Sequence, residues 1–115
     1  MEENLWKILT FETNPTSKPV DEFIHKQQPQ AKAKIMHTIK LLRQYGNRLG
    51  MPHAKILGSG LYELRIRGKE ELRIFYCIIQ AKIIYLLHAI KKQTQKTPNK
   101  DIEIAKRRMD SLTKI

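Results

Sequence analysis

Residues 61–88 read LYELRIRGKEELRIFYCIIQAKIIYLLH, and three apolar segments follow one another within them. The segments are rich in Ile, Leu, Tyr and Phe, so they predict β-strands over residues 61–67, 72–79 and 82–88. The connections between them are very short. Because parallel strands need a much longer crossover, the stretch predicts two consecutive antiparallel hairpins.

Each of these apolar strands also carries a basic side chain: Arg65, Arg73 and His88. A three-residue turn at residues 68–70 would pair Arg65 with Arg73, and a two-residue turn at residues 80–81 would pair Arg73 with His88. Since side chains alternate across a strand, all three would then lie side by side on one face. Directly opposed like charges are unfavourable without a counter-charge, so this face is expected to bind an anion.

The same pattern also fits a purely structural sheet face. Arginines on an antiparallel sheet are commonly solvated or paired, and Glu63 or Glu71 could be their partners. A slip of one residue in either hairpin would move part of the set to the other face. Tyr62 and Tyr76 fall on the face opposite Arg73 and could stack on bases or belong to the core.

The rest of the chain predicts one more strand and three helices. The strand covers residues 5–11, and the helices cover 20–27, 30–45 and a C-terminal segment that begins with Thr97 as N-cap and Pro98 at its first position. Gly46 is expected to end the second helix, and residues 46–60 are expected to form a loop. The order predicts a single α+β domain over residues 1–115.

The charge balance narrows the class of partner. The chain has 22 Lys and Arg against 11 Asp and Glu, a net charge of +11 spread along its length. Such a field attracts nucleic acid, an anionic membrane surface or an acidic protein. No apolar run approaches the roughly 18–20 residues of a membrane-spanning helix, and the N-terminus lacks signal-peptide features. We therefore expect a cytoplasmic protein with no membrane partner.

The cysteine and histidines predict no cofactor chemistry. Cys77 is the single cysteine and lies in an apolar strand, so it is expected to be a small core residue rather than part of a disulfide. His25, His37 and His53 have no metal-ligand spacing with each other or with Cys77. We expect no metal and no other cofactor.

Several short motifs, in this order, resemble one known family: PVDEF (19–23), KILG (55–58), GLYELR (60–65), RIFY (73–76), LHA (87–89), TQKTP (94–98) and EIAKR (103–107). Together they resemble the phage-derived, HigB-like branch of the RelE/ParE toxin superfamily. The resemblance implies a small toxin with a twisted antiparallel sheet of about four strands, flanked by an N-terminal helical pair and a C-terminal helix.

The resemblance also implies an activity and partners. Such toxins belong to type II toxin–antitoxin pairs, so the partner would be a helix-turn-helix antitoxin encoded by an adjacent gene. RelE and HigB members cut messenger RNA without a metal, commonly on the translating ribosome. ParE members share the fold but inhibit DNA gyrase. A gyrase inhibitor and a non-toxic basic RNA-binding module therefore remain alternatives to an mRNA endoribonuclease.

By position, the resemblance assigns Arg65 and Arg73 to the basic cleft and Lys92 to the first lysine of the usual Lys-Lys-Thr-Gln-Lys-Thr-Pro segment. Lys55 matches a basic position before the sheet. This chain departs from the family where Gln93 replaces the second lysine and Ile90 replaces a phenylalanine. Further phosphate contacts are expected from the neighbouring cations Arg67, Lys91 and Lys96.

These residues suggest cleavage by the RNA's own 2′-hydroxyl, which needs a base, an acid and cations around the phosphate. Arg65 and Arg73 are expected to clamp the phosphate, since an arginine stays charged and donates two hydrogen bonds. Lys55 and Lys92 could supplement this clamp. A lysine surrounded by cations can have a lowered pKa and serve as the base, and His88 could be the acid or the base. Replacement of Arg73 by alanine is expected to abolish cleavage and leave the fold intact.

Overall fold

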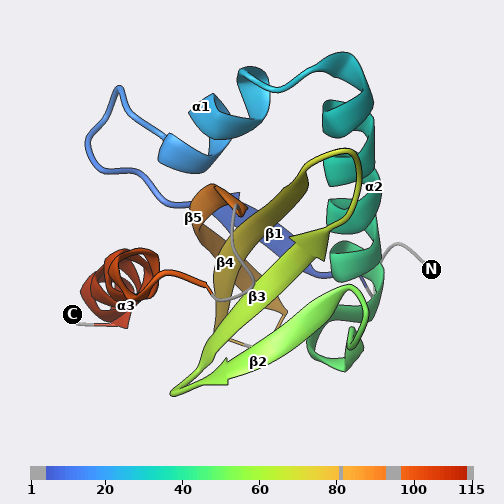
Figure 1. Ribbon diagram of the computed structural model, residues 1–115. Helices are drawn as coiled ribbons and strands as arrows, with labels where there is room; N and C mark the ends of the chain where they lie inside the picture. Colours follow the sequence, from blue (N-terminus) through green and yellow to red (C-terminus); the bar gives the residue numbers. More distant parts are fainter. Residues whose placement is uncertain (1–4, 81, 93–96, 114–115) are drawn as a thin grey trace.

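The computed structural model describes residues 5–80, 82–92 and 97–113 (Figure 1). Its elements are β1 (Lys7–Thr10), α1 (Pro19–His25), α2 (Pro29–Tyr45), the 3-10 helix η2 (Gly46–Arg48), β2 (Ala54–Gly58), β3 (Leu61–Ile66), β4 (Glu71–Gln80), β5 (Ile83–Lys92) and α3 (Asn99–Thr113). The predicted α+β class is confirmed.

The sheet has five strands in the order β1-β5-β4-β3-β2, where about four were expected. β1 pairs with β5 in parallel, and all other neighbours are antiparallel, so the sheet is mixed. The strand absent from the prediction is β2, an edge strand inside the expected loop. Its Ile56 is 70% exposed, so β2 lacks the apolar alternation by which a half-buried strand is recognised.

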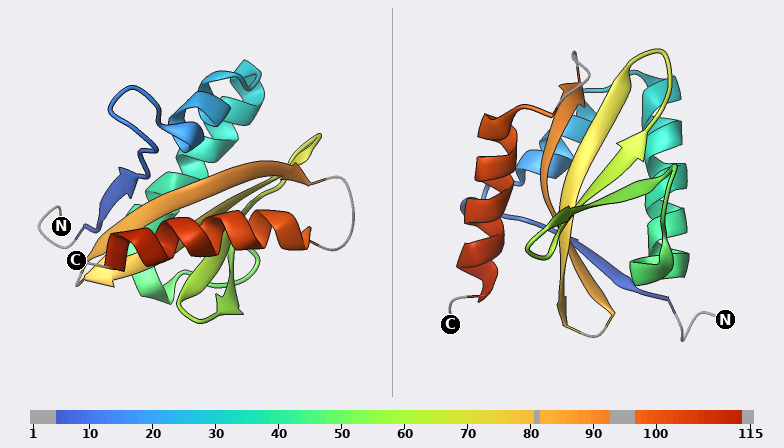
Figure 2. Two further views of the ribbon diagram at one scale, coloured as in Figure 1. Left: turned by 90° about the vertical axis from the view of Figure 1, so that its left-hand side faces the viewer. Right: turned by 60° about the horizontal axis from the view of Figure 1, so that its bottom comes forward.

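Helices cover both faces of the sheet. α1 and α2 lie on one face and α3 on the other (Figure 2). One core cluster lies beneath α1 and α2 and includes Ile35, Leu42 and Tyr76. A second lies beneath α3 and includes Phe75, Cys77 and Ala105. Cys77 is buried there, as predicted, and burial raises the pKa of its thiol to about 11.

The long helix α2 begins and ends at residues that suit those positions. Pro29 occupies its first turn, where the missing backbone N–H is no loss. Gly46 ends the helix as predicted, with a φ of 55°. A Cβ at this position would lie 1.9 Å from Cε2 of Trp6, so only glycine fits beneath the indole ring. α3 begins one residue later than predicted.

The first hairpin has the predicted register, with Arg65 opposite Arg73. The second does not. Arg73 lies opposite Ile90, and His88 lies opposite Phe75. Gln80 pairs with Ile83 and Lys82 takes a φ of 66° in the connection, so the strands are displaced by two residues from the expected pairing. A displacement of two keeps every side chain on its face, so Arg65, Arg73 and His88 still share one face.

None of the helices in the described part of the chain is both long enough and apolar enough to cross a membrane.

Candidate active site

A buried carboxylate lies between the two paired arginines on the α3 side of the sheet. Oε1 of Glu63 accepts hydrogen bonds from Nε of Arg65 and from Nη1 of Arg73, both at 3.2 Å. Its Oε2 accepts a hydrogen bond from Oγ1 of Thr97 at 2.7 Å. Glu63 is only 1% exposed. The counter-charge that this face requires is thus supplied by the protein itself.

Arg73 is part of the protein framework rather than an open phosphate contact. It is 2% exposed, and its guanidinium also pairs with Glu71 through Nη2. Nε of Arg73 is buried and has no hydrogen-bond partner among the described residues. Because removal of one member of a buried ion pair leaves the other charge uncompensated, this placement contradicts the expectation that Arg73 can be replaced without effect on the fold.

Two further cations lie around Glu71. Nζ of Lys92 and Nη1 of Arg67 are each 3.9 Å from its carboxylate. The Lys92 side chain is only 9% exposed, whereas the Arg67 side chain is 63% exposed. Burial and the positive charge of Arg73 lower the pKa of Lys92, against an opposing effect from Glu71. A lysine in this setting loses its proton more easily than a solvated one.

Taken together, four cations surround two carboxylates. We call this set the basic cluster, and its members are Glu63, Arg65, Arg67, Glu71, Arg73 and Lys92. The Arg65 side chain is 13% exposed and the Arg67 side chain is far more so, which leaves these two arginines accessible from outside. The excess of positive charge at a partly desolvated surface can hold one additional anion.

His88 lies further along the same face and is tied to α3. Its Nε2 is 2.7 Å from Oδ1 of Asp101. Its ring stacks on Phe75 with 5.9 Å between the centroids. Arg108 donates a hydrogen bond to the backbone oxygen of Leu87 at 2.8 Å, and its Nη1 is 3.5 Å from Nδ1 of His88. The predicted contact between Arg73 and His88 is wrong, since Ile90 occupies that position.

Sequence reasoning missed the roles of Thr97 and Asp101. Thr97 was expected to cap α3, but α3 begins at Asn99 and the Thr97 hydroxyl donates to Glu63. Asp101 lies in the first turn of α3, where acidic residues are common, so nothing in its position marked it as a partner of His88. Both contacts depend on how α3 docks across the sheet.

The remaining predicted residues are divided between the two faces. Lys55 lies opposite Glu63 in the β2–β3 pairing, so it shares the face of the basic cluster and is exposed. Lys91 lies opposite Leu72, on the α1–α2 side, where its Nζ is 3.1 Å from Glu70. Lys91 therefore lies on the opposite face from Lys92 and the basic cluster, where it cannot join them in a phosphate contact. Lys96 and Gln93 fall outside the described residues.

Tyr62 and Tyr76 lie on the opposite face from Arg73, as strand alternation predicted. Their rings stack with 5.1 Å between centroids, and Tyr76 is buried in the core beneath α2. Burial raises the pKa of Tyr76. Of the two interpretations left open for these tyrosines, the core one agrees with the structure.

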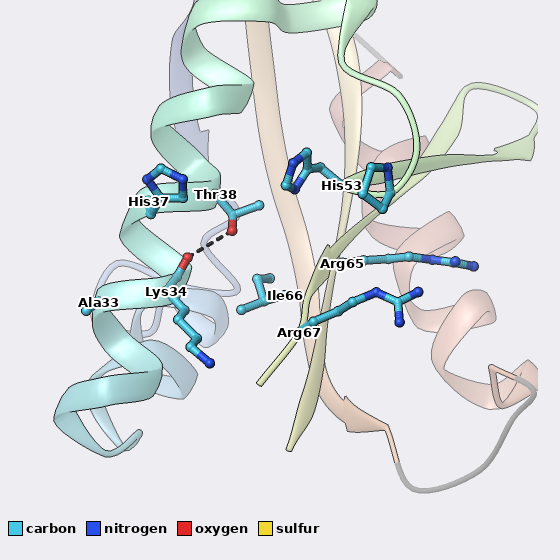
Figure 3. A pocket seen from close by; sticks show the side chains of 9 residues that line it. Ala33, Lys34, His37, Thr38, His53, Arg65, Ile66 and Arg67 are labelled. Carbon is cyan, nitrogen blue, oxygen red and sulfur yellow. Dashed lines mark hydrogen bonds between the residues drawn. The ribbon is translucent and has the colours of Figure 1, made fainter. Parts of the chain in front are cut away.

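A cavity of about 370 Å³ lies between α2 and the end of β3. Figure 3 shows Lys34 and His37 extending from α2, while Arg65 of β3 and Arg67, just beyond its end, extend on the side away from that helix. His53 lies near the top of this view. Within the described part of the chain, no three His, Cys, Asp or Glu side chains lie close enough together to hold a metal ion.

Comparison with known proteins shows the family to which the chain belongs. A search of curated proteins finds no significant match to the sequence. The profile of a protein family described as "Phage derived protein Gp49-like (DUF891)" matches residues 22–110. The matched range runs from α1 to α3 and includes the whole basic cluster. The chain therefore belongs to the phage-derived Gp49-like family, which is related to toxin–antitoxin systems.

Proposed function

We propose that this protein is the toxin of a type II toxin–antitoxin pair and that it cuts messenger RNA on the translating ribosome without a metal ion. The observation that supports cleavage most directly is the basic cluster, in which four cations surround two carboxylates and Lys92 has a lowered pKa. The partner would be a helix-turn-helix antitoxin whose gene lies next to this one. Membership of a toxin–antitoxin-related family supports that assignment.

In this proposal the RNA supplies its own nucleophile. A base removes the proton of a 2′-hydroxyl, whose oxygen forms a bond to the adjacent phosphorus. The bond from phosphorus to the 5′-oxygen of the next nucleotide breaks, and an acid protonates that oxygen. The products are a cyclic phosphate and a free 5′-hydroxyl. Cations around the phosphate stabilise the charge that develops during this exchange.

The exposure and contacts of the side chains suggest a different role in this reaction for each residue. Arg65 is partly exposed and is our candidate for the direct phosphate contact, assisted by the exposed Arg67 and Lys55. Arg73 is a positioning residue, since it is buried and shares an oxygen of Glu63 with Arg65. Lys92 is our candidate for the base. His88, held by Asp101, is our candidate for the acid.

Induced expression tests the proposal. Growth arrest accompanied by new transcript 5′-ends, mapped by primer extension, is the expected result. Lys40 is an exposed lysine on α2, away from the basic cluster, so a Lys40→Gln variant serves as the matched control for cation substitutions. Normal growth on strong induction would instead favour a non-toxic RNA-binding module.

Gyrase inhibition is the second candidate. The observation that favours it is that the proposed catalytic side chains already have partners. Arg65 pairs with Glu63 and Arg73 with Glu71, and His88 pairs with Asp101. Side chains paired in this way suit a binding surface as well as a reactive one. A supercoiling assay with purified gyrase, run beside the transcript mapping, separates the two. Growth arrest with blocked supercoiling and no new transcript ends would replace our proposal with this one.

A further inference from the structure

A second basic surface lies on the other side of the β3–β4 hairpin from the basic cluster. A cavity of about 940 Å³ is enclosed by the end of α1, the start of α2, the hairpin and the end of β5. Figure 1 shows this hairpin reaching toward the first turns of α2. Five cations line the cavity: Lys26, Lys34, Arg67, Lys69 and Lys91.

The charges in this cavity are poorly balanced. Glu70 is the one acidic residue among the described residues that line it, and it pairs with Lys91. Lys26, Lys34 and Lys69 have no acidic partner within the described part of the chain. A Cβ at Gly68 would lie 3.0 Å from Nζ of Lys34, so the glycine allows this ammonium group to approach the hairpin closely. A surface with this much unpaired positive charge attracts a polyanion.

The neutral residues of the cavity indicate which polyanion fits. Gln27, Gln28 and Gln30 line it, and so does Phe23, whose partly buried ring also packs against the core beneath α1 and α2. Nε2 of Gln27 donates to the backbone oxygen of Phe23, which leaves the amide oxygen of Gln27 available as an acceptor. Amides that read base edges and rings that stack on bases are what single-stranded RNA recognition uses. An acidic protein segment would need the lysines but not these groups.

The cavity also continues into the candidate active site. Arg67 and Lys34 line both this cavity and the smaller one of Figure 3, and Arg65 lines the smaller one as well. Arg65 in turn bonds to Glu63 within the basic cluster. A strand bound at Arg65 can therefore pass over the end of β3 and enter the large cavity without leaving basic surface.

We infer that the large cavity binds the single-stranded RNA that flanks the nucleotide held at Arg65, through phosphate contacts from Lys26, Lys34 and Lys69. The inference rests on the proposed function, since it takes RNA as the substrate. It assigns these three lysines to RNA affinity and not to chemistry. The volume of about 940 Å³ lies near the upper end of the roughly 300–1,000 Å³ of ligand sites, which leaves room for a nucleotide.

The test compares two triple variants with equal loss of charge. The cavity variant carries Lys26→Gln, Lys34→Gln and Lys69→Gln. The control carries Lys18→Gln, Lys40→Gln and Lys106→Gln, all at exposed lysines outside the cavity. Binding is measured by fluorescence anisotropy with fully 2′-O-methylated RNA, which has no free 2′-hydroxyl and so cannot be cut by the proposed reaction. Oligonucleotides of about 3 and about 12 nucleotides bracket the lower range of single-strand site sizes.

The cavity variant is expected to bind the longer RNA on the order of 10- to 100-fold more weakly than the control at about 0.1 M salt. The slope of log affinity against log salt should fall by about 2, since each lost contact to single-stranded RNA contributes about 0.7. Binding of the shorter RNA should be the same in both variants. Equal affinity and slope for the longer RNA in both variants would overturn the inference.

Further outcomes distinguish a failure of the cavity inference from a failure of the proposed function. If the cavity variant loses binding to poly-glutamate while it keeps RNA affinity, the cavity serves an acidic protein and the inference is wrong. If the unmodified protein neither binds the oligonucleotides nor produces new transcript ends, the proposed function fails first. If the unmodified protein cuts RNA but the cavity variant binds the longer RNA as well as the control does, the inference about the cavity is wrong and the proposed function still holds.

Discussion

Glu63 and Arg73 form an ion pair of 3.2 Å in which both side chains are almost completely buried. The same oxygen of Glu63 also accepts from Arg65, so one carboxylate fixes two guanidinium groups on neighbouring strands. This arrangement explains how two arginines can lie directly opposite each other in a sheet. It also separates their roles, because Arg65 remains partly exposed and Arg73 does not.

Replacement of Arg73 by alanine is expected to destabilise the protein by about 3–5 kcal/mol, because Glu63 and Glu71 each lose a cationic partner and the buried charge of Glu63 is left with Arg65 alone among its described ion pairs. Urea unfolding measures this change. Arg67→Ala is the matched control, since Arg67 is exposed, and should change stability by no more than about 0.5 kcal/mol. Equal stability of the two variants would contradict the structural role of Arg73.

Lys92 is expected to make cleavage depend on pH. Its pKa is lowered chiefly by burial and by Arg73, so its neutral, basic form becomes populated at a lower pH than for a solvated lysine. The rate should therefore rise with pH up to that lowered pKa. In Lys92→Arg this rise of the rate with pH should disappear and most of the rate should be lost, since arginine stays charged. A pH–rate profile unchanged by Lys92→Arg would exclude Lys92 as the base.

The same shift has a consequence for stability. Between the lowered pKa of folded Lys92 and its ordinary value near 10.4, the unfolded chain binds more protons than the folded one. The contribution of Lys92 therefore makes the protein more stable as pH rises through this window. Urea midpoints of the unmodified protein and of Lys92→Met, compared across alkaline pH, measure it. If the urea midpoints of both proteins change with pH in the same way, the pKa of Lys92 is not lowered in the folded protein.

Asp101 is expected to hold the start of α3 against the sheet through His88. Asp101→Ala removes the partner of a largely buried imidazole and should cost about 1–3 kcal/mol. Hydrogen exchange should speed up in α3 and remain unchanged in α2, which packs on the other face. Uniform changes across both helices would show that the contact does not act locally.

Cys77 is expected to be unreactive while the protein is folded. Its thiol is buried, and burial raises its pKa to about 11, so little thiolate forms near neutral pH. A thiol reagent at pH 8 should label it only after a denaturant is added. Rapid labelling of the native protein would contradict the position of Cys77 in the core.

The sequence predicted those features of the fold that depend on short-range rules. The three-residue turn after Arg67 fixed the first hairpin, and alternation placed Tyr62 and Tyr76 on the face opposite Arg73. The register of the second hairpin was predicted wrongly, because its connection contains no strong turn residue and because the pairing shifts near Gln80. Alternation nevertheless placed His88 on the correct face, since the error was two residues.

The candidate site could be predicted only in part, for a different reason. Arg65 and Arg73 stand out because cations interrupt apolar strands, whereas Lys92 is assigned by the family resemblance. The pairing of His88 with Asp101, and that of Thr97 with Glu63, join residues from separate elements that meet only when α3 docks. The cavity lysines were missed because Lys26, Lys34 and Lys69 look like ordinary solvated charges until the hairpin reaches α2.

Cleavage of RNA at the basic cluster can be measured with purified components. Purified protein is added to ribosomes stalled on a messenger RNA, and the 5′-ends of the transcript are mapped. We predict defined new ends with the unmodified protein and with Lys40→Ala. With folded Arg65→Ala the ends should be reduced on the order of 100-fold or more, as when one preorganised contact to a developing charge is lost. No new ends with the unmodified protein, or undiminished ends with Arg65→Ala, would show that the basic cluster does not cut RNA in this way.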